Sequence, residues 1–322
     1  MNRMHRLPSF LLALILLSAC EKQAGETPAA RLSLNALPAS GLEEVHSLDL
    51  LVYRAGDGMR DAYLKTGGKS SLQVSVTRGQ RLHWYLIANA PASAQLEACE
   101  KEETFLSSEL LLSQAVSDGL VMLASGISPG SGEAILRPYA CKITLQGLSV
   151  PWRDSFYPAP ACILERVVLV NVRGSVQYGG IPSALADDLW YNPSRDDAQA
   201  PPLDGLLAWN GPVTIPPEGL YGLGISLFAL PNPSEGDETG PENWTPRQTR
   251  MALQLRIDNM LQWYSVDLPA LQAGTHYLIQ EAVITGPGTS QIDSGMHRSE
   301  IAFTCTVVPW DTWQQDLQLP LE

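Results

Sequence analysis

The sequence predicts an all-β protein made of two β-sandwich domains in tandem, with one short helix in the first domain. The clearest strands lie near the C-terminus, where one apolar face recurs at every second residue through 277–284 and 301–308. A period of two is typical of half-buried strands. Gly286-Pro287-Gly288 ends the first of them, because Pro287 donates no ladder hydrogen bond and glycine allows positive φ. Many short strands joined by turn residues favour two sandwiches.

Residues 46–135 are predicted to form the N-terminal β-sandwich domain. Gly56-Asp57-Gly58 and Arg78-Gly79-Gln80 have the composition of tight turns between antiparallel strands. The one predicted helix runs from Thr104 to Val116, with Thr104 as its N-cap and apolar side chains along one side. The predicted strands are 48–53, 72–76, 82–88, 120–124 and 134–136.

Residues 136–310 are predicted to form the C-terminal β-sandwich domain. The run 163–172 is almost continuously apolar, which is typical of a strand at the centre of a sandwich. Asp258-Asn259 is expected to be a hairpin turn. Residues 182–218 and 231–247 are rich in Pro, Asp, Asn and Gly and are expected to be long surface loops. Further strands are predicted at 139–145, 221–227 and 251–257.

The first residues have the pattern of an export signal. Arg3 and Arg6 precede an apolar run, Leu7 to Leu17, that is too short to span a bilayer. Leu17-Ser18-Ala19-Cys20 then matches the lipobox of bacterial lipoproteins. We therefore predict a lipoprotein signal peptide at 1–19 and a diacylglycerol-modified Cys20; the alternative is an ordinary cleavage site with a chance cysteine.

Two segments flank the predicted domains. Residues 20–45 are rich in Ala, Gly, Pro and Ser and are expected to be a lipidated tether or propeptide, interrupted by a possible short strand at 30–34. Residues 311–322 form a C-terminal extension with one apolar face, which we expect to act as a donor strand in a groove. The side chains of that face are Trp313, Leu317, Leu319 and Leu321.

Charge and cysteine content exclude several classes of protein. Without the signal peptide, 19 of the 21 Lys and Arg residues remain against 34 Asp and Glu, a formal charge of −15. Nucleic-acid binding requires basic patches, so this charge argues against it as a function. The cysteines after Cys20 have no metal-ligand spacing and are expected to be small buried residues, with a disulfide involving Cys99 left open. They are Cys99, Cys141, Cys162 and Cys305.

The sequence contains no convincing catalytic, metal or cofactor motif. Gly126-Ile127-Ser128-Pro129-Gly130 matches GxSxG, but Pro129 has no N–H for an oxyanion hole, so we expect a turn. Asp187-Asp188 and Asp196-Asp197 are expected to be solvated loop carboxylates, with weak calcium binding as the alternative. The four histidines that follow the predicted signal peptide have no metal spacing and are expected at surfaces or strand edges. They are His46, His83, His276 and His297.

Five segments along the chain together have the pattern of a known family. The most specific is Thr285-Gly286-Pro287-Gly288-Thr289 near the end. The others are Leu48–Tyr53, Gly79-Gln80-Arg81 leading to Ile87-Ala88-Asn89, Arg137–Ile143, and Thr304–Val307 with Trp310. In this order, and from the first predicted strand to the last, they resemble the fimbrillins, the type V pilus subunits of Bacteroidales.

The resemblance implies a mechanism of assembly. Fimbrillins are exported as lipoproteins to the outer membrane, have two transthyretin-like β-sandwich domains, and in stalk subunits lose the first strand to an arginine-specific protease. A strand from a neighbouring subunit then fills the groove that the lost strand leaves. Arg31 is the candidate cleavage site here, the alternative being an ordinary polar residue of the tether.

The sequence therefore predicts a non-enzymatic, surface-exposed fimbrial subunit that needs no cofactor. Its partners would be other fimbrial subunits, the outer membrane through the lipid, and a host or bacterial adhesion receptor. The alternative is a monomeric surface lipoprotein that binds glycans through loop aromatics, and a third candidate is a hydrolase. The loop aromatics are Trp190, Tyr191, Trp209 and Trp244.

Overall fold

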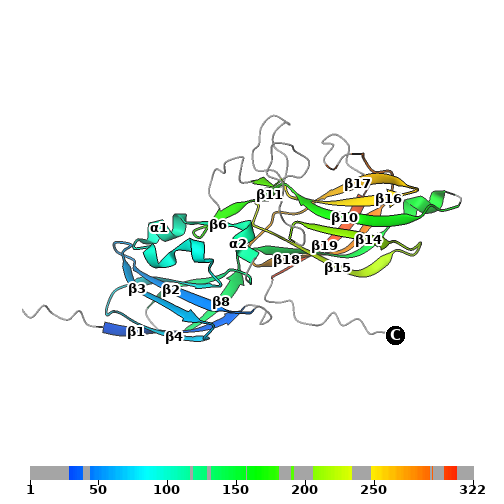
Figure 1. Cartoon of the computed structure of the whole chain (residues 1–322). Helices are drawn as coiled ribbons and strands as arrows, with labels where there is room; N and C mark the ends of the chain where they lie inside the picture. Colours follow the sequence, from blue (N-terminus) through cyan, green and yellow to red (C-terminus); the bar gives the residue numbers. More distant parts are fainter. Residues whose placement is uncertain are drawn as a thin grey trace, which may run out of the picture.

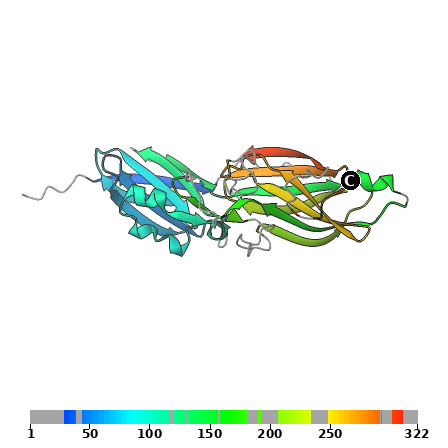
Figure 2. The same cartoon turned by 90° about the horizontal axis from the view of Figure 1, so that it is seen from above.

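A computed structural model shows two β-rich domains arranged end to end (Figures 1 and 2). Among the residues that it describes, no helix is long and apolar enough to cross a membrane. The described residues are 29–38, 44–116, 119–128, 132–156, 158–180, 190–191, 206–233, 248–290, 292 and 301–309.

The N-terminal domain is one curled sheet of seven strands in the order β3-β2-β5-β7-β8-β1-β4. The two outermost strands, β3 and β4, also contact each other, so the sheet folds over into two layers. The described pairs of this sheet are antiparallel except β1 with β8. The strands are β1 Ala29–Pro38, β2 Ser47–Arg54, β3 Arg60–Gly67, β4 Ser71–Thr77, β5 Leu82–Ala88, β7 Met122–Ser128 and β8 Gly132–Pro138.

The alternation in these strands sends apolar side chains to two different cores. On β2, Leu48, Leu50 and Val52 point into the space between the two layers. Leu51 and Tyr53 point to the opposite face, where helices cover the sheet. Because both faces of β2 are covered, this strand is buried almost throughout.

The prediction of one helix over 104–116 is wrong. The chain forms α1 Glu102–Ser107 and α2 Leu112–Val116, separated by the short strand β6 Glu109–Leu111. Thr104 lies inside α1, whose N-cap is Lys101. The helix is interrupted because β6 pairs with β12 Ser175–Gln177 of the second domain, and this ladder replaces helical hydrogen bonds. Two 3₁₀ turns, Ala92–Ala94 and Leu96–Ala98, precede α1.

The two domains share a continuous apolar core at this junction. The ring of Phe105 in α1 stacks on Tyr178 at a centroid distance of 5.2 Å, and Tyr178 meets Tyr139 edge-on at 5.5 Å. The Tyr139 hydroxyl also donates a hydrogen bond of 2.9 Å to the Tyr178 carbonyl. Buried residues from both domains belong to one cluster, so the junction is packed rather than a loose linker.

The C-terminal domain is a sandwich of two four-stranded sheets, β14-β10-β16-β17 and β15-β9-β18-β19. Among the described strands of this domain, only β9 and β18 pair in parallel. The strands of the sandwich are β9 Cys141–Ser149, β10 Cys162–Val170, β14 Ala208–Thr214, β15 Leu220–Ala229, β16 Arg250–Ile257, β17 Met260–Asp267, β18 Thr275–Ile284 and β19 Ile301–Pro309. A separate two-stranded sheet consists of β11 Val172–Arg173 and β13 Trp190–Tyr191. A 3₁₀ helix spans Pro151–Ser155.

Several local predictions are confirmed. In the C-terminal domain, the strands at the C-terminal end lie side by side as β18 and β19. Asp258 and Asn259 both have positive φ, 50° and 62°, as the hairpin between β16 and β17 requires. Across both domains, the four described cysteines are free thiols, three buried and Cys305 half-buried, so they pack as small apolar residues.

Candidate subunit-assembly site

The strand β1 lies inside the N-terminal sheet, between β8 and β4. It runs antiparallel to β4, with Ala29 opposite Thr77 and Asn35 opposite Ser71. Its second half runs parallel to β8, from Leu34 opposite Gly132 to Pro38 opposite Leu136. The segment 20–45, which we expected to be a tether with a short strand, thus contributes ten residues to the fold. β1 ends at Pro38, and its parallel partner β8 ends at Pro138. The strand β8 therefore runs past the domain boundary that the sequence predicted between residues 135 and 136.

The apolar face of β1 is almost completely buried. Leu32, Leu34 and Ala36 are 1%, 2% and 4% exposed and pack with the leucines of β2, β4 and β5 between the layers. Burying a leucine stabilises a fold by roughly 1.5 to 3 kcal/mol. The alternating residues Ser33, Asn35 and Leu37 face outwards. The buried side chains Leu32, Leu34 and Ala36 therefore fill a groove in the sheet that has the shape of one strand.

The neighbours of β1 depend on it for their backbone pairing. Within the described part of the sheet, β1 is the only hydrogen-bonded neighbour of β4. On its other side, β8 pairs with β7 through only two residue pairs, Met122 with Pro138 and Leu123 with Arg137. Loss of β1 would leave two strands with unpaired edges, which a strand from another molecule could pair with.

Arg31 is the third residue of β1, not part of a free tether. Its side chain is exposed, but its backbone pairs with Ser75 of β4. Leu32 and Leu34 follow it in the same strand. The sequence indicated a possible short strand at 30–34, but it did not show that this strand belongs to the domain core rather than to the tether.

The remaining predicted assembly residues lie outside the described residues. These are the lipidation site Cys20 and the donor-strand face, Trp313, Leu317, Leu319 and Leu321. The tail follows directly after β19, which is an edge strand of its sheet.

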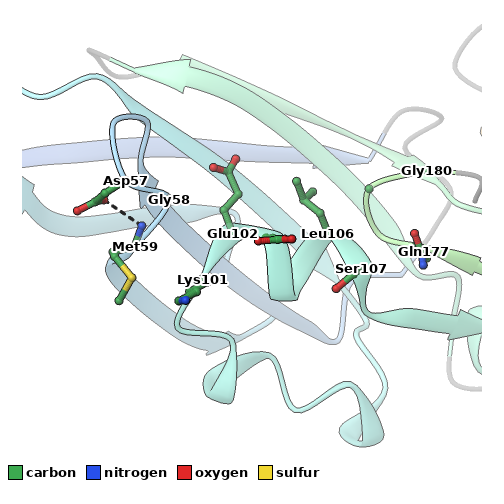
Figure 3. Close-up of a pocket in the computed structure, with 11 residues that line it drawn as sticks. Asp57, Gly58, Met59, Lys101, Glu102, Leu106, Ser107, Gln177 and Gly180 are labelled. Atoms are coloured by element: carbon green, nitrogen blue, oxygen red, sulfur yellow. Dashed lines mark hydrogen bonds between the residues drawn. The ribbon is translucent and has the colours of Figure 1, made fainter.

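A cavity of about 690 Å³ lies where α1 meets the second domain (Figure 3). Glu102 in its wall accepts a hydrogen bond of 2.6 Å from the Tyr85 hydroxyl and lies 2.8 Å from Nδ1 of His83. Burial, together with this hydrogen bond, raises the pKa of Tyr85. The hydroxyl of Ser107 donates to the Thr104 carbonyl. The lining residues are Asp57, Gly58, Met59, Lys101, Glu102, Glu103, Leu106, Ser107, Gln177, Gly179 and Gly180.

The described residues that line this cavity are not arranged for catalysis. Its carboxylate Glu102 is engaged with His83 and Tyr85, and no base lies against Ser107 in the described hydrogen bonds. Across the described residues no group of three His, Cys, Asp or Glu side chains could hold a metal ion. The GxSxG match lies at the end of β7, and the next element is the strand β8, whereas a nucleophile elbow leads into a helix.

The loop aromatics do not form a sugar-binding platform in the described residues. Tyr191 and Trp209 are half-buried and pack against the main core. Trp244, the acidic pairs 187–188 and 196–197, and His297 lie outside the described residues, as does the side-chain environment of Trp190.

The prediction that all histidines lie at surfaces or edges is wrong for His276. It sits on β18, between β9 and β19, and is 2% exposed. Its Nε2 lies 2.8 Å from Oγ1 of Thr144, which lies 3.0 Å from the hydroxyl of Ser226. Burial, and secondarily the charge of Lys142, lowers the pKa of His276 to about 4. A neutral histidine is therefore built into this sheet.

We expect His276 to make the fold sensitive to acid. The unfolded chain binds a proton near the ordinary pKa of about 6.5, whereas the folded chain resists protonation down to about pH 4. The free energy of unfolding should therefore decrease as the pH is lowered from 6.5 to 4, by up to about 3 kcal/mol. The free energy of unfolding, measured in urea at pH 7.5 and 4.5, should decline less between the two pH values for His276→Gln than for wild type. An equal decline would contradict this account, and His46→Gln, at an exposed position, is the control.

Comparison with solved structures identifies the architecture. A fimbrilin, FimA, from Porphyromonas gingivalis superimposes with a TM-score of 0.60 at 14% identity, over 87% of this chain and 97% of that one. A proposed cell adhesion protein from Parabacteroides distasonis superimposes with a TM-score of 0.63 at 15% sequence identity, over 88% of this chain and 98% of that one. The tip fimbrial protein Mfa3 from P. gingivalis, with a C-terminal truncation, superimposes with a TM-score of 0.53 at 14% sequence identity, over 88% of this chain and 100% of that one.

This chain has the fimbrillin fold. The similarity extends over both domains, so the prediction of an all-β chain with two fimbrillin-like sandwiches is confirmed. Comparison of the sequence with protein-family models and with curated proteins finds no match. At these identities the structural similarity establishes the fold, and function has to be argued from the chain's own residues.

Proposed function

We propose that this chain is a non-enzymatic structural subunit of a cell-surface fimbria, joined to other fimbrial subunits by strand exchange and supporting adhesion. The observation that carries the proposal is the place of β1. It is a single strand near the N-terminus that fills a groove between β8 and β4. Proteins with the same fold include a fimbrilin and a tip fimbrial protein, which supports the proposal.

The C-terminal tail has a pattern suited to such a groove. Leu317, Leu319 and Leu321 recur at every second residue, as Leu32 and Leu34 do in β1. A strand with this spacing places its leucines on one face, while its backbone pairs with strands on both sides. We therefore propose that the tail is a donor strand that replaces β1 in another subunit.

The described residues favour this function over glycan binding by a monomer. Sugar stacking requires an exposed aromatic face, whereas the rings of Tyr191 and Trp209 pack against the core. The groove of β1, in contrast, explains both a buried N-terminal strand and an apolar tail.

Composition analysis of isolated fimbriae tests this function. Mass spectrometry of fimbriae sheared from cells should detect this chain at a fixed ratio to the other subunits, and N-terminal sequencing should locate its first residue. Recovery of the chain only as a monomer, with none in fimbriae, would contradict the proposal.

We further propose that Cys20 carries the lipid that holds the chain at the outer membrane. Cys20→Ala is expected to abolish incorporation of a fatty-acid analogue and to leave an unprocessed precursor, because the thiol is the acylation site. The measurement is labelling and membrane fractionation of the two proteins. Cys99→Ala, which removes a buried thiol, is the control and should stay labelled. Equal labelling of wild type and Cys20→Ala would refute the assignment.

A further inference from the structure

The chain that links the buried part of β1 to β2 has no site for a protease that cuts after arginine or lysine. Between Arg31 and Arg54 the sequence contains neither Lys nor Arg. This interval includes the three side chains that fill the groove, Leu32, Leu34 and Ala36, and the whole connection to β2. An arginine-specific protease therefore has two places to cut near β1, one on each side of the groove-filling residues.

A cut after Arg31 would leave the groove filled. It would remove only the first three residues of β1, so all five residue pairs with β8, from Leu34 to Pro38, would persist. Of the seven pairs with β4, those of Leu32 to Asn35 would also persist. The remaining strand would stay covalently linked to β2, and its buried leucines would keep their contacts.

A cut after Arg54 is blocked by the fold. Arg54 is the last residue of β2, which pairs with β3 on one side and β5 on the other. The residues before it, Val52 and Tyr53, are fully buried. Its guanidinium is also held by Asp57 at 2.8 and 3.1 Å. Proteases bind substrates as extended, unpaired segments, so this bond is protected while the domain is folded.

We infer that this chain keeps its own β1 in the N-terminal sheet, and so donates a strand to a fimbria without accepting one. The occupant of its groove is Leu32–Pro38 of the same chain. The inference rests on the proposed strand exchange and specifies its direction. A subunit of this kind ends a polymer, because no further subunit can add to its N-terminal domain.

A designed cleavage site after β1 provides the test. Glu44 follows β1, and its side chain is 84% exposed. Glu44→Arg introduces an arginine beyond all groove-filling residues, and Glu44→Gln is the matched control without a cleavage site. Each protein, with the full chain after Cys20, is treated with an arginine-specific protease and passed through enough urea to release any cut strand. Intact mass and binding of a fluorescent peptide of residues 311–322 are then measured.

We expect wild type and Glu44→Gln to begin no later than Leu32 and to bind the peptide at least tenfold more weakly than cleaved Glu44→Arg. Added wild type should also shorten polymers of cleaved Glu44→Arg in proportion to its concentration. Peptide binding by protease-treated wild type equal to that of Glu44→Arg, or longer polymers on its addition, would overturn the inference. If cleaved Glu44→Arg, shown by mass to have lost β1, binds no peptide, strand exchange itself is rejected and the inference with it.

Discussion

Leu34→Asp is expected to unfold the N-terminal domain at physiological temperature. Leu34 is 2% exposed, lies between β8 and β4, and packs into the core between the two layers. The substitution removes roughly 1.5 to 3 kcal/mol of apolar burial and places a carboxylate where no described cation can pair with it. A total loss of about 4 kcal/mol or more is a large fraction of the stability of a typical domain.

The neighbouring residue provides a matched control for this substitution. Asn35 lies on the exposed face of the same strand, so Asn35→Asp adds the same charge without burying it and should change stability by less than about 0.5 kcal/mol. Urea unfolding, followed by tyrosine and tryptophan fluorescence, measures both. Equal stability of the two variants would show that β1 is not an integral strand.

Leu319→Asp is expected to abolish donation of the tail while leaving the fold intact. The substitution removes the burial of one leucine, roughly 1.5 to 3 kcal/mol, and adds a charge that the groove cannot solvate. At 1.4 kcal/mol per factor of ten, binding should weaken at least about tenfold. The measurement is addition of the variant to cleaved Glu44→Arg, whose groove is open.

Gln318→Asp carries the same charge on the opposite face of the tail and should add to the acceptor as wild type does. Deletion of 311–322 should be as inactive as Leu319→Asp. All three proteins are expected to melt like wild type, because the last strand in the described part of the chain, β19, ends at Pro309, before the tail begins. Addition of the deletion variant at the wild-type rate would place the donor strand elsewhere in the chain.

Much of the fold could be predicted because its signals are local. The alternation of apolar and polar residues in 277–284 and 301–308 identified β18 and β19, and Asp258-Asn259 identified a turn that needs two residues with positive φ. In each case the side-chain pattern and the backbone preference of a few residues determine the structure.

The errors arose where a distant segment determines the structure. The apolar spacing of 104–116 suits a helix, but β6 forms there because β12, more than sixty residues later, pairs with it. His276 is polar and was expected at a surface, yet Thr144 from β9 supplies its hydrogen bond inside the sheet. Neither partner is visible in the local sequence.

The candidate site was only partly predictable for the same reason. The alternation of Leu32 and Leu34 indicated a short strand, but its composition did not distinguish a strand in a tether from one in a core. The position of β1 between β8 and β4 depends on a parallel pairing with residues 132–136, which only the fold reveals. The antiparallel pairing with β4, in which Arg31 lies opposite Ser75, places Arg31 within the sheet.

Photo-cross-linking at position 319 tests strand exchange most directly. A donor chain with a photoreactive amino acid in place of Leu319, labelled with heavy isotopes, is mixed with unlabelled, cleaved Glu44→Arg and irradiated. Mass spectrometry of the products should show heavy-to-light cross-links to β4, residues 71–77, or β8, residues 132–138, of the acceptor. Cross-links confined to the donor's own C-terminal domain, with none to these two strands, would contradict assembly by strand exchange.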